Sequence, residues 1–505
     1  MVAGIHHVTG ITANVQKNVD FYMGFLGLRL IKQTGGYEDG AQLHLLYGDH
    51  EGRPGSLLTF LVWQDGGAGR AGLGAISEVS LAVPAASLGD WLTRALAAGV
   101  PVTGPARELG EPVLRLRDPD GLVLRLVGVP EEGDGTPLRV HGVTILTGDG
   151  DRTAEFVRRF GYHESAREGP FIRLTSGHDM VDVRASGGFV PAMLGGGAID
   201  HVAFRAPDAE AVRQMRLSLK DHPGLTHVHD RKYFLSLYVR EPMGTLLEYA
   251  TDGPGFLIDE DADHLGKTLM IPPHDAARAA DLKVMLPQFA LPGEPRLPAR
   301  DLPFVHRFYT PDDPDGSVIV LAHGSGGTEA DLMPLAHRIA PRATLLGVRG
   351  RSHEEGNARW FRRFGEGVFD QADIRAEAGA FAAFLDGAVK GYGLDRARMT
   401  GIGYSNGANF LGAALQLHPG ALPRAILLRG IGALEDPPKS PPKSPPIGSR
   451  ALVITGEADP YAGRAASLVM GLSGAGVEVT ERRIAAGHGL DPADEEAARA
   501  WLAEA

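Results

Sequence analysis

Three absences narrow the possible functions before any motif is considered. The 505-residue chain has no cysteine, which excludes disulfides, zinc–thiolate sites and a thiol nucleophile. No apolar run approaches the roughly 20 residues that cross a bilayer, and no leader precedes the first expected strand. The formal charge is −12 and no basic stretch carries interleaved aromatics, which argues against a nucleic-acid partner. We expect a soluble, cytoplasmic protein without a membrane or nucleic-acid partner.

A fourfold repeat is the main feature that the sequence does have. Similar apolar segments open four units of about 55 to 70 residues each: Ile5–Thr9, Ile76–Ser80, Val140–Thr144 and Ile199–Ala203. Helical stretches follow at residues 15–26, 88–98, 153–160 and 208–219. Apolar runs close the units at residues 55–60, 121–126 and 244–249, with a weaker run near 180–183. Each unit predicts a βαβββ module, and a pair of modules would curl into a cup that can hold a ligand.

Comparison of the four modules separates ligand positions from scaffold positions. The opening position holds His7, Glu78, Gly142 and His201, and the closing position holds Thr59, Arg125, no clear carboxylate in the third module, and Glu248. Only the first and fourth modules keep metal-capable groups. Two imidazoles and one carboxylate are typical of an Fe(II) site that leaves positions open for dioxygen and substrate. We therefore predict a metal site at His7, His201 and Glu248, with Mn(II) as the alternative metal.

Six further segments carry a family resemblance over residues 1–290: residues 4–9, 18–22, 26–30, 230–234, 238–242 and 248–256. They resemble the vicinal oxygen chelate superfamily, and within it the four-module dioxygenases that cleave hydroquinone rings. The resemblance implies iron ligands at the three positions already named. It also implies substrate-pocket roles for His6, Thr9, Arg231 and Tyr238. One departure is Asp200, where relatives often carry a histidine, and it leaves the exact substrate open.

Two residues near the predicted metal site bear on its chemistry. Glyoxalase-type isomerases of this superfamily typically hold their metal with four protein ligands, and Thr59 stands where the fourth would be. A three-ligand set leaves more of the metal open for dioxygen, which ring cleavage needs. His6 precedes a ligand on the same expected strand, so it points to the opposite face if that strand is regular. It would reach the substrate only if the strand twists or bulges there.

The pattern changes towards the C-terminus. We expect module pairs at residues 1–132 and 133–256, a linker at 257–302 that packs on the dioxygenase half, and a further domain at 303–505. In this last domain, apolar strands alternate with helices, at residues 317–322, 344–348, 399–403, 425–428 and 451–455. Strands that are apolar throughout and alternate with helices predict a mainly parallel sheet with helices on both faces.

A hydrolase motif lies between a strand and a helix of this last domain. Gly403-Tyr404-Ser405-Asn406-Gly407 matches a nucleophile elbow, and Asp459 and His488 follow in the order Ser, Asp, His. His488 would take the Ser405 proton and Asp459 would hold the imidazole tautomer. Glu457 is the alternative acid, but the loop beyond the strand favours Asp459.

Backbone N–H groups near Ser325 and at Asn406 would form an oxyanion hole for this triad. Residues 303–505 resemble small α/β-hydrolase carboxylesterases of the acyl-thioesterase and phospholipase-like group, through residues 359–364 and 403–409. We therefore expect an α+β half of four βαβββ modules, with the vicinal oxygen chelate fold, joined to an α/β-hydrolase domain.

The leading hypothesis is a bifunctional aromatic-degrading enzyme. An Fe(II)-dependent dioxygenase would open a hydroquinone-like ring with dioxygen, and a serine esterase would hydrolyse an ester or acyl product. The alternatives for the first half are a glyoxalase-type metal-dependent lyase or isomerase, and a module that binds quinones or an antibiotic, each fused to a serine esterase. The oligomeric state stays open, a homo-oligomer included.

Overall fold

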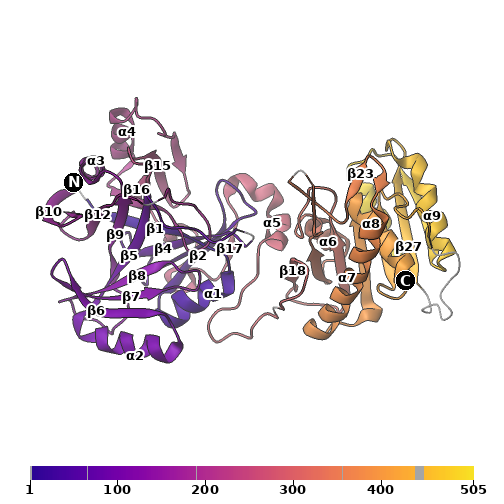
Figure 1. Ribbon diagram of the computed structural model, residues 1–505, viewed down its shortest axis with the longest axis horizontal. Coiled ribbons are helices and arrows are strands. Elements are labelled where there is room, and N and C mark those ends of the chain that lie inside the picture. The colour runs from indigo at the N-terminus through magenta and orange to yellow at the C-terminus, as the bar shows by residue number, and fades with distance from the viewer. Residues whose placement is uncertain are drawn as a thin grey trace. The chain divides into compact units, whose positions relative to one another are not determined.

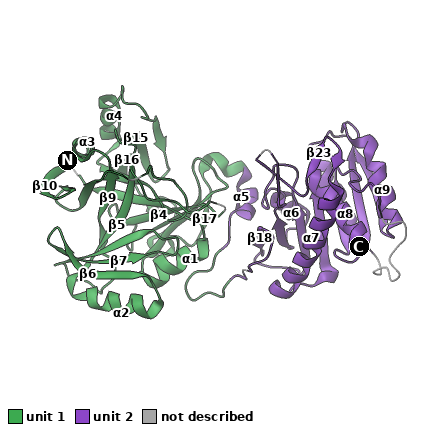
Figure 2. Ribbon diagram, viewed as in Figure 1, with its two compact units in different colours: residues 1–277, 289–296 green, residues 278–288, 297–505 purple. Residues whose placement is uncertain are grey.

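The computed structural model describes residues 3–64, 66–188, 190–298, 300–354, 356–437 and 449–504. The chain divides there into two compact units, residues 1–277 with 289–296 and residues 278–288 with 297–505 (Figure 2). The segment expected as a linker is shared between them, because helix α5 (Ala279–Met285) belongs to the second unit, where Asp281 pairs with Arg338 at 2.6 Å. No helix of the described chain is long and apolar enough to cross a membrane.

Each repeat of the first unit folds as the predicted module, a strand, a helix and three more strands (Figure 1). Module 1 comprises β1 (Ile5–Thr12), α1 (Val15–Val19), β2 (Arg29–Gly35), β3 (Leu43–Gly48) and β4 (Leu57–Val62). Module 2 comprises β5 (Ala75–Pro84), α2 (Leu88–Ala98), β6 (Val102–Glu108), β7 (Glu111–Arg117) and β8 (Val123–Val129). Module 3 comprises β9 (Arg139–Thr147), α3 (Gly150–Val157), β10 (His163–Glu168), β11 (Phe171–Thr175) and β12 (Met180–Ala185). Module 4 comprises β13 (Ile199–Ala206), α4 (Ala209–Ser218), β14 (Val228–Asp230), β15 (Phe234–Arg240) and β16 (Leu246–Pro254).

The modules pair first with fourth and second with third. Among the described residues, one sheet has the strand order β14-β15-β16-β13-β1-β4-β3-β2-β17, where β17 is Leu269–Met270. The other has the order β10-β11-β12-β9-β5-β8-β7-β6. This differs from the sequential grouping of residues 1–132 and 133–256, because β1 lies antiparallel to β13, with Val8 opposite Val202, while β5 lies antiparallel to β9. The non-sequential pairing puts His7 and His201 on neighbouring strands.

The second unit is built on one mainly parallel sheet, as predicted. In the described chain its order is β18 (His306–Tyr309), β20 (Thr344–Val348), β19 (Val318–Ala322), β25 (Met399–Tyr404), β26 (Arg424–Leu428), β27 (Arg450–Gly456) and β28 (Glu478–Ile484). Only the edge strand β18 runs antiparallel to its neighbour in this sheet. Two hairpins lie outside it: β21 (Ser352–Glu354) with β22 (Asn357–Arg359), and β23 (Arg363–Gly365) with β24 (Val368–Phe369).

Helices cover both faces of this sheet because its central strands are buried on both sides. One core cluster includes residues of α7 (Gln371–Tyr392), α8 (Asn406–Leu417) and α9 (Ala465–Gly474). The other includes residues of α5, α6 (Met333–Ile339) and α10 (Pro492–Ala503). The carboxyl ends of the strands are therefore free to carry functional loops.

Candidate active sites

The first candidate site is formed by His7 on β1, His201 on β13 and Glu248 on β16, all three buried. Nε2 of His7 lies 3.3 Å from Nε2 of His201, and Oε2 of Glu248 lies 3.2 Å from the first and 2.9 Å from the second. Ligands at right angles in an octahedral site, with bonds of about 2.1 Å, are about 3.0 Å apart. The spacing therefore fits one face of an octahedral metal centre.

The chemistry of these donors also fits a metal ion. Oε2 of Glu248 is buried, and the ring nitrogens of His201 and His7 face it at 2.9 and 3.2 Å without a well-aligned hydrogen bond. Such an oxygen is costly unless a cation binds it. Burial opposes charge on His201, but its hydrogen bonds to the carboxylates of Asp200 and Glu248, and the charges of both groups, raise the pKa of His201 to about 9. The site is thus built to hold a positive charge between carboxylates.

Neighbouring side chains orient each ligand. Nδ1 of His201 lies 2.7 Å from a carboxylate oxygen of Asp200, and the hydroxyl of Ser236 donates to Oε1 of Glu248. A carboxylate that accepts from the far nitrogen of an imidazole leaves the near nitrogen as the metal ligand. Asp200, which stood out in the sequence only as a departure from relatives, is therefore a partner of a candidate metal ligand.

His6 contacts the candidate ligand His7 and does not line the cavity beside His7 and His201. The register of β1 against β13 shifts between Ile5 and His7, so the strand is irregular at His6. Nδ1 of His6 lies 2.9 Å from Nδ1 of His7. Burial lowers the pKa of His6 to about 3, so its neutral ring can accept the Nδ1 proton of His7 and leave Nε2 of His7 for a metal. His6 lines a separate cavity of about 160 Å³.

The other predicted residues of the first half line one cavity of about 510 Å³ with the candidate ligands His7 and His201. Thr9 Oγ1 lies 3.0 Å from Nε2 of His201. The Arg231 guanidinium lies 5.5 Å from the centre of the Tyr238 ring and pairs with Glu38 at 2.7 Å. Burial raises the pKa of Tyr238, so its phenol stays a hydrogen-bond donor.

Sequence reasoning missed several residues of this cavity, among them Tyr37, His44 and His229. His44 donates to or accepts from Thr59 at 2.9 Å, and Thr59 lies 2.8 Å from the Thr9 hydroxyl. Burial lowers the pKa of His44 to about 3, so this ring is neutral. Periodicity could place His44 on a strand, but no short motif marks it as a pocket residue.

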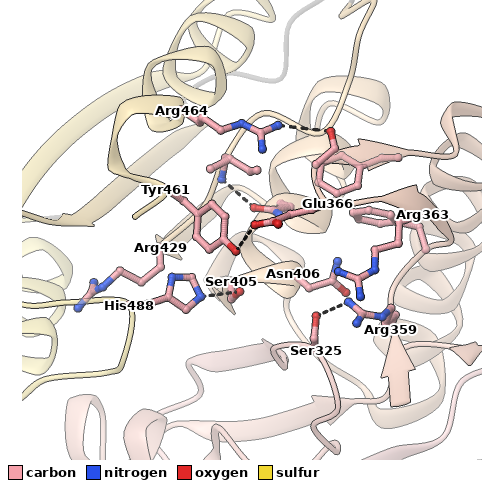
Figure 3. Close-up of a pocket in the computed structure, with 15 residues that line it drawn as sticks. Ser325, Arg359, Arg363, Glu366, Ser405, Asn406, Arg429, Tyr461, Arg464 and His488 are labelled. Atoms are coloured by element: carbon pink, nitrogen blue, oxygen red, sulfur yellow. Dashed lines mark hydrogen bonds between the residues drawn. The ribbon is translucent and has the colours of Figure 1, made fainter. Parts of the chain in front are cut away.

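The second candidate site is the nucleophile elbow of the second unit (Figure 3). Ser405 lies between β25 and α8 with φ 51° and ψ −113°, a strained conformation for a residue with a side chain. A Cβ atom on Gly407 would collide with the carbonyl oxygen of Ala322, and one on Gly403 would lie 2.7 Å from the Gly407 carbonyl oxygen. The glycines are therefore required for the close approach that presents Ser405.

The predicted triad residues are hydrogen bonded in sequence. Nε2 of His488 lies 3.0 Å from Oγ of Ser405, and Nδ1 of His488 lies 3.0 Å from Oδ2 of Asp459. Asp459 is buried, whereas Glu457 is exposed. The geometry thus gives the acid position to Asp459 and suits proton transfer from the serine to the imidazole.

A buried ion pair holds the loop that carries His488. The Arg429 guanidinium binds both carboxylate oxygens of Asp494, at 2.8 and 2.9 Å, and both side chains are fully buried. The same guanidinium donates to the carbonyl oxygens of Gly487 at 2.8 Å and Gly489 at 3.1 Å, on either side of His488. Sequence reasoning missed this pair because 65 residues separate its members.

The predicted oxyanion-hole residues Ser325 and Asn406 both line the cavity at Ser405, which has a volume of about 300 Å³. Asn406 is the first residue of α8, where backbone N–H groups have no acceptor within the helix. Its side-chain oxygen accepts from the Trp360 amide at 2.9 Å, and the Ser325 hydroxyl accepts from Arg359 at 2.7 Å. These bonds hold both residues beside the nucleophile.

Comparison with known proteins identifies the family of the first unit. Residues 4–126 match the model of the Glyoxalase/Bleomycin resistance protein/Dioxygenase superfamily. "Putative ring-cleaving dioxygenase MhqO" of Bacillus subtilis is 35% identical over 285 residues, which cover 53% of this chain and 91% of that protein. The chain belongs to this superfamily. A second relative, "Chlorohydroquinone/hydroquinone 1,2-dioxygenase" of Sphingobium indicum, is 31% identical, over 54% of this chain and 92% of that protein.

The second unit resembles a different kind of protein. "Putative hydrolase MhqD" of Bacillus subtilis is 34% identical over 191 residues, which cover 37% of this chain and 94% of that protein. This chain thus covers almost the full length of a dioxygenase-type relative and of a hydrolase-type relative. The protein is an enzyme that joins a dioxygenase-type unit to a hydrolase-type unit.

Proposed function

We propose that the first unit is an Fe(II)-dependent dioxygenase that cleaves hydroquinone-like rings, and that the second is a serine esterase. The observation that carries the first part is the convergence of His7, His201 and Glu248 on one point beneath the 510 Å³ cavity. Three ligands on one face leave the opposite face open for substrate and dioxygen. The names of the hydroquinone dioxygenase and ring-cleaving relatives support this substrate class.

The residues of the chain have separate tasks in this proposal. Bound iron would supply the one-electron chemistry that dioxygen needs to attack an aromatic ring. Asp200 would keep the proton of His201 on Nδ1, and His6 would keep the proton of His7 on Nδ1. The Nε2 atom of each imidazole would then be free to bind the metal. Arg231 and Tyr238 lie on the cavity wall as cationic and phenolic donors, suited to bind the oxygens of the ring.

Thr59 supports a dioxygenase over a glyoxalase-type isomerase. It faces Thr9 across β1 and β4, as Glu248 faces Ala203 across β13 and β16. Its position in module 1 therefore corresponds to that of Glu248 in module 4. Its hydroxyl is bonded to Thr9 and His44, so the metal keeps three protein ligands.

The test of the first part is oxygen uptake. Protein loaded with Fe(II) without air receives hydroquinone or methylhydroquinone in an oxygen electrode, and the absorbance spectrum is followed in parallel. We expect uptake together with a ring-opened chromophore, and neither in His201→Ala. Bound iron without uptake would contradict ring cleavage and favour the lyase or isomerase reaction.

In the second unit, Ser405 attacks the ester carbonyl while His488 accepts its proton, and the resulting acyl-enzyme is released by water. The geometry of the triad carries this part of the proposal. Hydrolysis of 4-nitrophenyl acetate tests it. We expect turnover in the wild-type protein, and loss of both turnover and fluorophosphonate labelling in Ser405→Ala. Turnover that survives in Ser405→Ala would contradict the assignment.

A further inference from the structure

The cavity at Ser405 is lined with arginine. Arg359, Arg363, Arg429 and Arg464 all line it, against one lining carboxylate, Glu366. Arg429 is committed to Asp494 and to the His488 loop. The other three form what we term the arginine cluster: Arg359 at the end of β22, Arg363 on β23 and Arg464 before α9.

Two members of the arginine cluster share one carboxylate. Glu354 Oε2 lies 3.2 Å from Nε of Arg359 and 3.5 Å from Nε of Arg363. Arg359 also donates to the Ser325 hydroxyl, beside the predicted oxyanion hole. Its side chain is only 12% exposed, and the ion pair of its Nε atom with Glu354 lacks hydrogen-bond geometry. The guanidinium of Arg363 is more open, at 39% exposed.

Among the residues that the structure describes, Arg464 forms no ion pair with a carboxylate, and its guanidinium donates to the carbonyl oxygen of Gly367 at a long 3.4 Å. A Cβ atom on Gly367 would collide with the guanidinium, so the β23–β24 turn admits Arg464 because residue 367 is a glycine. Glu366, next to it, accepts from the Tyr461 hydroxyl at 2.9 Å (Figure 3).

The balance of charge in the cavity indicates which chemical group a substrate would carry. Among the described residues, the arginine cluster has three positive charges against the carboxylates of Glu354 and Glu366, in a chain whose net charge is −12. A guanidinium at a partly enclosed site binds carboxylates strongly through paired hydrogen bonds. One unmatched positive charge in the substrate cavity is complementary to one carboxylate on the substrate.

We infer that the hydrolase site acts on esters that carry a free carboxylate, which the arginine cluster binds. This rests on the proposed esterase function. The reaction is RCOOR′ + H₂O → RCOOH + R′OH: the Ser405 oxygen bonds to the acyl carbon, the C–OR′ bond breaks, and R′O takes the proton from His488. Water then gives one proton to His488 and its oxygen to the acyl carbon, which releases the acid and regenerates Ser405. The carboxylate takes no part in bond making.

The inference also fits the proposed first reaction. Cleavage of a ring beside a hydroxylated carbon, with both atoms of dioxygen retained, turns that carbon into a carboxyl group. Products of the first unit would therefore carry the charge that the second unit binds. The class of substrate follows from the arginine cluster and does not depend on direct transfer between the units.

The test compares two esters that differ by one charge. Mono-4-nitrophenyl fumarate carries a free carboxylate, and methyl 4-nitrophenyl fumarate is its neutral counterpart; the trans double bond prevents the carboxylate from attacking its own ester. We expect kcat/KM at least tenfold higher for the charged ester, mainly through a lower KM. Added salt should reduce this ratio, because it screens a partly exposed charge pair.

Variants connect the ratio to the arginine cluster. In Arg464→Met and Arg363→Met, the ratio of the two kcat/KM values should fall towards one, and in Arg464→Glu below one. Arg482→Met is the matched control, because Arg482 is an exposed arginine on β28 that does not line the cavity. It should leave both kcat/KM values as in the wild-type protein.

The outcomes separate the two proposals. Hydrolysis of both esters with a ratio of one or less overturns the carboxylate inference and leaves the esterase standing. Turnover of 4-nitrophenyl acetate without hydrolysis of either fumarate also overturns the carboxylate inference. Hydrolysis of none of the three esters overturns the esterase, and binding of monomethyl fumarate to Ser405→Ala, measured by titration calorimetry, then decides the inference. If Ser405→Ala binds monomethyl fumarate and the double variant Ser405→Ala, Arg464→Met does not, the carboxylate inference is supported. If Ser405→Ala does not bind it, or both variants bind it equally, the inference is overturned.

Discussion

The two sheets of the first unit present the same four positions with different chemistry. In the sheet of modules 1 and 4 these positions hold His7, Thr59, His201 and Glu248, and in the sheet of modules 2 and 3 they hold Glu78, Arg125, Gly142 and Asp182. Asp182 faces Thr144 as Glu248 faces Ala203. The third module thus has a carboxylate at its closing position, where the sequence showed no clear one.

The buried carboxylates of the two sheets are neutralised in different ways. Asp182 pairs with Arg173 at 2.7 Å and with Arg125 at 3.3 Å, and all three side chains are nearly inaccessible to solvent. Glu248 faces two imidazoles and keeps an unsatisfied oxygen. One sheet therefore carries its own cations, and the other has a place for a metal ion. In both sheets the same module position buries a carboxylate. The neighbouring side chains determine whether arginine or a metal ion neutralises it.

The largest expected effect is the loss of ring cleavage when a candidate metal ligand is removed. Glu248→Ala removes a ligand and should lower kcat/KM for ring cleavage by at least about 10³-fold, since the reaction depends on the metal. Oxygen uptake with Fe(II) measures it. The matched change in the other sheet, Asp182→Asn, should retain ring cleavage in protein that stays folded. Equal losses in the two variants would contradict the division between the sheets.

The next largest expected effect is a loss of stability when the buried ion pair of the other sheet is broken. Asp182→Ala removes the carboxylate that Arg125 and Arg173 share, and leaves Arg173 with Glu111 at 2.8 Å and Arg125 with Glu78 and Glu108 at 3.7 Å. It should lower the free energy of unfolding of the first unit by about 3 kcal/mol. Urea denaturation followed by circular dichroism measures this change. The triple variant Arg125→Met, Arg173→Met, Asp182→Leu should recover most of it, because apolar groups can replace a buried ionic cluster. A loss below about 1 kcal/mol would show that the cluster is hydrated.

A smaller effect sharpens the role of the side chains around the metal ligands. Asp200→Asn keeps the shape of the side chain but weakens its hold on Nδ1 of His201, so metal affinity should fall about 10- to 100-fold. Competition with a chromogenic chelator measures the affinity without relying on activity. Asp221→Asn is the control, since Asp221 is exposed and does not line the cavity of the candidate ligands. Unchanged affinity in Asp200→Asn would remove Asp200 from the metal site.

Residues close in sequence or in repeating positions could be predicted without a structure. The four modules followed from repeated apolar segments, and Ser405 from the glycines on either side of it. The pairing of the first module with the fourth could not be derived from the order of the chain, because it depends on which strand edges meet after folding. Alignment of the modules nevertheless gave His7, His201 and Glu248 as one group.

Residues that act through another residue could not be predicted. His6 orients His7 because β1 is irregular at that point, a feature of register that sequence does not encode locally. Asp494 supports the His488 loop through Arg429 because α10 returns to the sheet. The arginine cluster lies partly in a short motif, but Arg464 joins it from another element, past Gly367.

The central claim is that one of the two sheets binds a metal ion and the other replaces it with arginine. The most direct test is the iron content of protein reconstituted with Fe(II) without air and freed of excess metal. The account predicts a single iron per chain in the wild-type protein and in Asp182→Asn, and none in Glu248→Ala. Iron retained in folded Glu248→Ala, or lost in folded Asp182→Asn, would contradict it.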